Sequence, residues 1–91
     1  MNLSCKVHRA PEIAWRVIED EAVIIDPRNG LVYPFNEVAT FCWQACDGKL
    51  SIADIINKAF EEFEVSLEQI EKDLVEFFSE LIRQNLILSD D

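Results

Sequence analysis

The sequence has few of the features on which secretion, membrane insertion or disorder depend. Its 91 residues include two glycines, three prolines and three cysteines. Scarce glycine and proline argue against a low-complexity chain, and no apolar run approaches the length of a bilayer-spanning helix. Three cysteines are an odd number, too few for the disulfide framework of a small secreted domain. We therefore expect one folded domain in the reducing cytoplasm.

Groups suited to catalysis or metal binding are also scarce. The single histidine, His8, lies in a segment without a regular pattern, where histidine is more often solvated than catalytic. Cys42 and Cys46 could lie on one side of a helix, but a zinc site would need Cys5 and His8 to complete it. Both cysteines also suit a core as small hydrophobes. We expect no catalytic group, no metal and no cofactor.

Basic residues are too few to balance the acidic ones. The net charge is −10, and residues 51–91 carry three basic and eleven acidic side chains. A field of this sign repels phosphate backbones and anionic lipid headgroups. The charge therefore disfavours nucleic acid and membrane partners.

What the chain does contain is a strand-like pattern followed by a helical one. Residues 1–14 show no sustained period and are predicted to form an N-terminal arm, which leaves residues 15–91 as the domain. Three segments rich in aromatic and β-branched residues are predicted strands: Trp15–Glu19, Ala22–Asp26 and Leu31–Phe35. Because Pro34 cannot donate to a sheet ladder, we expect the third strand at a sheet edge.

Capping residues predict three helices after the strands. Asn36 suits the N-cap of the first helix, and Gly48 is placed to close it. Ser51 and Ser66 open the second and third helices, each in a capping-box pattern, and the third should end near Gln84. Three antiparallel strands followed by three helices predict an α+β domain of winged-helix type.

The third predicted helix has an apolar stripe wider than one packing contact needs. The stripe consists of Leu67, Ile70, Leu74, Phe77, Phe78 and Leu81, with Val75 and Ile82 on one flank. Two explanations stay open: either two neighbouring elements bury the helix at once, or one flank (shoulder) of the stripe forms the floor of a groove. A winged helix that reads DNA would need a basic recognition helix, whereas this one carries five acidic residues against Lys72 and Arg83.

The segment from Tyr33 to Gly48 resembles the signature of the PqqD-like family, the recognition elements of ribosomally made peptide natural products. In that family a strand ends in an apolar residue plus Asn, and a helix follows that carries Ala and Trp and closes with Asp-Gly. The start of the second helix, from Ser51 to Ile56, is similar too, and the resemblance covers about Trp15 to Leu88.

The resemblance implies a non-catalytic, leader-peptide-binding domain of three antiparallel strands packed on three helices. A precursor's leader would dock as a fourth strand on the third strand and be presented to a modifying enzyme, often a radical SAM enzyme. The implied contact residues are Leu31, Val32, Tyr33 and Pro34 on the strand, and Ile70, Asp73, Leu74 and Phe77 on the third helix. Phe35 stands where leucine is commoner, and Pro34 removes one donor, which affects the register of the peptide.

Another class of function stays open beside this one. An acidic accessory subunit could dock onto a partner enzyme through its helices without binding peptide directly. An exposed edge strand also permits a homodimer.

Overall fold

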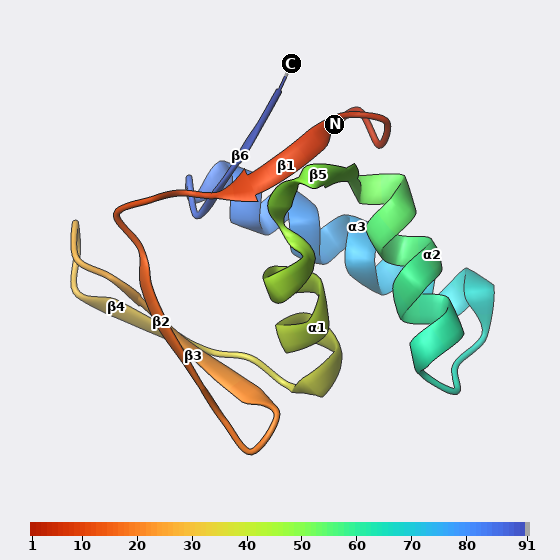
Figure 1. Cartoon of the computed structure of the whole chain (residues 1–91), viewed down its shortest axis with the longest axis horizontal. Coiled ribbons are helices and arrows are strands. Elements are labelled where there is room, and N and C mark those ends of the chain that lie inside the picture. Colours follow the sequence, from red (N-terminus) through yellow and green to blue (C-terminus); the bar gives the residue numbers. More distant parts are fainter. Residues whose placement is uncertain (91) are drawn as a thin grey trace.

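The chain forms two small antiparallel sheets joined by three helices, and the computed structural model describes residues 1–90 (Figure 1). The first sheet has the order β2-β3-β4, with strands Ala14–Ile18, Glu21–Asp26 and Leu31–Pro34. Glu19 and Asp20 have positive φ angles of 51° and 67°, as a tight two-residue hairpin turn requires. The three predicted strands and the edge position of the third are confirmed.

The second sheet, of order β5-β1-β6, was not expected. Its strands are β1 (Lys6–Arg9), β5 (Asp47–Ser51) and β6 (Ile87–Ser89). The expectation that the N-terminal arm lacks regular structure is therefore corrected, because β1 is the middle strand and its Val7 is fully buried. Each strand is three to five residues long, too short for a period to show in the sequence.

The helices are α1 (Glu37–Ala45), α2 (Ile52–Glu62) and α3 (Leu67–Arg83), and their predicted starts are confirmed. Asn36 Oδ1 accepts a hydrogen bond from Ala39 N at 2.8 Å, and Ser51 forms a reciprocal capping box. The helix α1 ends at Ala45 with Cys46 as its C-cap, close to the predicted end at Cys46. The predicted role of Gly48 in closing this helix is wrong, because Gly48, with φ of 88°, lies inside β5.

The hydrophobic core lies where the two sheets meet the helices. Trp43 of α1 is fully buried at its centre, and α1 packs against β3. The largest buried side chains around it are Val7, Ile24, Ile52, Ile55, Phe78, Leu86 and Ile87. The α+β class is confirmed, whereas the winged-helix arrangement stays a prediction. Along residues 1–90, none of the helices combines the length and apolar character needed to span a bilayer.

Candidate functional site

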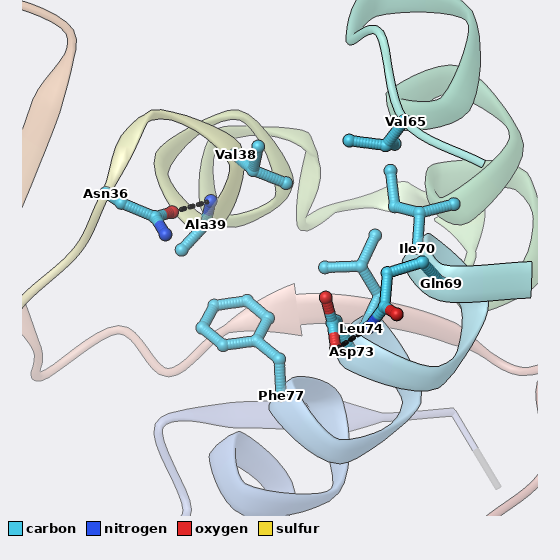
Figure 2. Close-up of a pocket in the computed structure, with 9 residues that line it drawn as sticks. All are labelled: Asn36, Val38, Ala39, Val65, Gln69, Ile70, Asp73, Leu74 and Phe77. Carbon is cyan, nitrogen blue, oxygen red and sulfur yellow. Dashed lines mark hydrogen bonds between the residues drawn. The ribbon is translucent and has the colours of Figure 1, made fainter. Parts of the chain in front are cut away.

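A pocket of about 210 Å³ lies between the start of α1 and the N-terminal half of α3 (Figure 2). Its lining is mostly apolar: Val38, Ala39, Val65, Ile70, Leu74 and Phe77. Asn36, Gln69 and Asp73 supply the polar groups. A mostly apolar concavity with a few convergent polar groups is the usual form of a binding site.

The width of the apolar stripe on α3 explains why a pocket forms there. Ile70 and Leu74 are buried against the core, as are Phe78 and Leu81 further along the helix. Phe77 lies on the shoulder of the stripe and is only partly buried. One part of the apolar stripe on α3 is thus packed into the core, and its flank at Phe77 lines the pocket. Both explanations for the width of the stripe, burial against the core and a surface for binding, therefore apply.

The polar groups of the pocket are held in place by local hydrogen bonds. Gln69 Nε2 donates to Asp73 Oδ1 at 2.9 Å, one turn along α3. Gln69 N in turn donates to Ser66 Oγ, the N-cap of the helix. Asp73 is exposed and, among residues 1–90, is the one charged side chain in the lining. A ligand with an apolar group for the pocket and a cation or N–H donor beside it would match this arrangement.

The register of β3 and β4 shows which backbone groups face the open edge. Phe35 N donates to Ala22 O at 2.8 Å, which makes that pair a hydrogen-bonded one. Antiparallel pairs alternate, so Tyr33 and Ile24 are hydrogen-bonded, whereas Val32 and Pro34 turn their backbone groups away from β3. The free edge therefore offers the N–H and C=O of Val32 but only the C=O of Pro34.

The end of β4 is tied to the pocket through aromatic contacts. The ring of Phe35, the residue after β4, lies 5.2 Å from the ring of Phe77 and 5.8 Å from that of Trp43. Both pairs are edge-to-face, the arrangement that aromatic side chains prefer. The open edge thus leads directly to the shoulder of α3.

The other end of β4 is tied to α3 by Arg28. Its guanidinium binds the Asp26 carboxylate and also donates to the backbone carbonyls of Gln84 and Asn85, at 3.2 and 3.1 Å. These two carbonyls directly follow the last residue of α3, Arg83, so Arg28 holds the turn in which the helix ends. The residues that flank β4, Arg28 before it and Phe35 after it, thus both contact α3 or the turn that ends it.

The structure divides the predicted contact residues into two groups. Those on the third helix, Ile70, Asp73, Leu74 and Phe77, all line the pocket. Those on the strand form the open edge and do not line it: Leu31, Val32, Tyr33 and Pro34. The remaining lining residues were not predicted from the sequence: Asn36, Val38, Ala39, Val65 and Gln69. Asn36 was recognised only as a helix cap, and Val65 carried no signal.

The two cysteines weighed as metal ligands lie in the core. Cys42 and Cys46 are fully buried, and burial raises the pKa of each thiol to about 12. Cys46 Sγ donates to the carbonyl of Cys42 at 3.2 Å. Within residues 1–90, no three His, Cys, Asp or Glu side chains gather as a metal site would require.

Residues 21–87 match the sequence model of a family described as coenzyme PQQ synthesis protein D (PqqD), a stretch that contains the pocket and the edge strand. Among curated proteins, none matches this sequence.

Two solved structures share the fold. One is TbiB1 in complex with the TbiA(beta) leader peptide, with a TM-score of 0.76 and 20% identity over 88% of this chain and 93% of that one. Another is lasso peptide synthetase B1 complexed with the leader peptide, with a TM-score of 0.75 and 24% identity over 91% and 98%. At such identities the likeness shows the fold.

Proposed function

The chain belongs to the PqqD family, and we propose that it binds the leader segment of a ribosomally made precursor peptide and presents it to a modifying enzyme. The leader pairs with the open edge of β4 as a fourth strand. One of its apolar side chains enters the pocket between α1 and α3. The two structural neighbours, both described as complexes with leader peptides, support this assignment.

The observation that carries the proposal is that an unpaired strand edge and an apolar pocket lie next to each other. An open edge offers main-chain hydrogen bonds to any extended peptide, which supplies affinity without selectivity. The pocket supplies selectivity, because it accepts a side chain of limited size and apolar character. The contact between Phe35 and Phe77 joins the two elements, so a single extended peptide can reach both.

The hydrogen bonds of the edge define how the leader docks. A leader residue opposite Val32 exchanges two main-chain hydrogen bonds with it. At Pro34 the strand can only accept, so the leader must donate there. Asp73 stands at the pocket and pairs with a lysine or arginine of the leader.

The proposed role includes no chemistry by this chain. General acid–base or nucleophilic catalysis needs a positioned pair of groups. In the part of the chain that the structure describes, the pocket lining contains one titratable side chain, Asp73, and no histidine, cysteine, serine or lysine. Modification of the precursor is therefore assigned to the partner enzyme.

An amide NMR titration with the leader segment of any short precursor peptide whose gene is found next to that of this chain tests the proposal. We expect shifts at Leu31–Phe35 and along the pocket-facing turns of α3. Residues of β6, on the other sheet, serve as the internal control and should not shift. Absence of any shift with such leaders, or shifts confined to other surfaces, would contradict the peptide-binding role.

A further inference from the structure

The sheet β2-β3-β4 has an outer face that none of the described residues covers. Its register sorts the side chains into two sets, because successive residues of a strand point to opposite faces. Ala22, Ile24 and Asp26 of β3 are buried and define the inner face, which packs against α1. Their cross-strand partners belong to the same face. The outer set is Ala14, Arg16, Ile18, Glu21, Val23, Ile25, Val32 and Pro34.

This outer face is apolar and solvent-exposed. Ile18, Ile25 and Val32 are 56%, 44% and 57% exposed. Ile25 and Val32 lie directly opposite each other in a non-hydrogen-bonded pair, the closest cross-strand spacing in an antiparallel sheet. Six of the eight outer side chains are apolar, and the two charges, Arg16 and Glu21, cancel. A contiguous apolar face on a small acidic protein marks an interaction surface.

We infer that this outer face docks the modifying enzyme, an inference that rests on the proposed function. Val32 and Pro34 belong both to the outer face and to the open edge that receives the leader. A leader added to β4 extends the sheet, so every second leader side chain joins the outer face beside these two residues. An enzyme seated there contacts the sheet and the bound leader in one surface, and can distinguish the loaded protein from the empty one.

The charge distribution selects this partner over a second copy of the chain. Each copy carries −10, so two copies repel each other on approach. The acidic surplus lies in residues 51–91, which contain α2 and α3, whereas the outer face has no net charge. The partner that suits this face is therefore a globular enzyme with an exposed apolar patch and no acidic surplus around it.

Two variants that add the same charge to different sheets test the inference. Ile25→Glu places a carboxylate at the centre of the outer face, away from the β4 edge. Leu88→Glu, the control, places one on β6, where the leucine is similarly exposed at 39%. Each variant is titrated first with the leader alone and then, loaded with leader, with the enzyme that modifies the same precursor. Circular dichroism checks the fold, and Ile25→Thr with Leu88→Thr replaces the pair if the glutamates unfold it.

We expect Ile25→Glu to weaken enzyme binding by about tenfold or more, the loss typical of a central interface residue, while leader binding is unchanged. Leu88→Glu should bind both as the wild type does. Enzyme binding by Ile25→Glu that equals the wild type would overturn the inference and leave the proposed function intact. The inference would also be overturned if sedimentation showed that the wild type is a dimer and that Ile25→Glu is a monomer. That result would assign the face to a second copy of the chain. Failure of the wild type to bind leader in the first titration would count against the proposed function itself.

Discussion

Arg28 binds the Asp26 carboxylate through two donors: Nε lies 2.8 Å from Oδ1, and Nη2 lies 2.9 Å from Oδ2. The two residues lie at the turn between β3 and β4, and the same guanidinium reaches the carbonyls at the end of α3. Asp26 is buried while Arg28 stays partly exposed. A bidentate pair of this kind fixes both distance and orientation. It therefore fixes the β3–β4 turn against the end of α3.

Stability should fall in acid because of this pair. The Arg28 guanidinium beside Asp26 holds the pKa of that carboxyl below its ordinary value of 3.8. The unfolded chain therefore binds more protons than the folded one, so the pair's contribution is fully present above pH about 4 and is lost as the pH falls through the folded-state pKa. We expect the melting temperature of the wild type to drop more steeply below pH about 4 than that of Asp26→Asn.

Glu80→Gln is the matched control for this experiment. Arg83 also lowers the pKa of Glu80, but both side chains of that pair are largely exposed and screened by solvent. Its acid profile should therefore follow that of the wild type. A profile for Asp26→Asn as steep as that of the wild type would show that the pair does not govern acid stability.

Filling the pocket should weaken leader binding without disturbing the core. Ala39 lines the pocket from α1 and is only partly buried, so Ala39→Phe places a ring where the leader side chain would lie. We expect an affinity loss of about tenfold, roughly what the lost burial of one apolar side chain produces, measured by calorimetry. Ala53→Phe on α2 is the control, because Ala53 has a similar exposure and faces a different surface hollow. Equal losses in both variants would point to a general effect on folding instead.

Asp73 should give leader binding part of its dependence on salt. Exposed charge pairs are screened by added salt, so affinity for a leader that carries lysine or arginine beside its pocket residue should weaken as salt rises. Asp73→Asn is expected to lower affinity about threefold at low salt and to flatten the salt dependence, since an exposed pair contributes up to about 1 kcal/mol. Glu61→Gln on α2 removes the same charge away from the pocket and should change neither the leader affinity nor its salt dependence. A salt response in Asp73→Asn identical to that of the wild type would remove this residue from the site.

The sequence predicted those parts of the fold that depend on neighbouring residues. The N-caps at Asn36 and Ser51 are set by residues within the first turn of each helix, and both are confirmed. Strand β1 was missed because it is stabilised only by pairing with β5 and β6, which lie about 40 and 80 residues further along the chain.

The candidate site divides in the same way. The residues of α3 that line the pocket and were named beforehand, Ile70, Asp73, Leu74 and Phe77, were those that the family resemblance implied. Helical periodicity predicted only the apolar stripe to which three of them belong. The side formed by Val38 and Ala39 depends on how α1 approaches α3, which no local pattern encodes. The outer face of the first sheet depends on the pairing register, and a shift of one residue would have turned Ile25 inward.

The open edge supplies the most direct test of strand addition. Val32 and Pro34 are the two residues of β4 whose backbone groups face away from β3. Because Pro34 has no N–H, Val32 supplies the one outward donor of the strand. Val32→Pro therefore removes the last outward donor of the edge and leaves the hydrogen bonds between β3 and β4 intact. We expect the fold to persist and leader affinity to fall by about tenfold, because a main-chain bond lost within an interface also leaves the leader carbonyl unpaired.

Two further variants separate the backbone from the side chain in that test. Val32→Thr keeps the N–H, the β-branched shape and the strand preference, so leader affinity should stay close to that of the wild type. Pro34→Ala adds a donor at the next outward position, and we expect equal or up to about threefold tighter binding. Leader affinity that Val32→Pro leaves unchanged would show that the peptide does not pair with β4. The pocket would then be the whole of the recognition site, since its lining includes no residue of that strand.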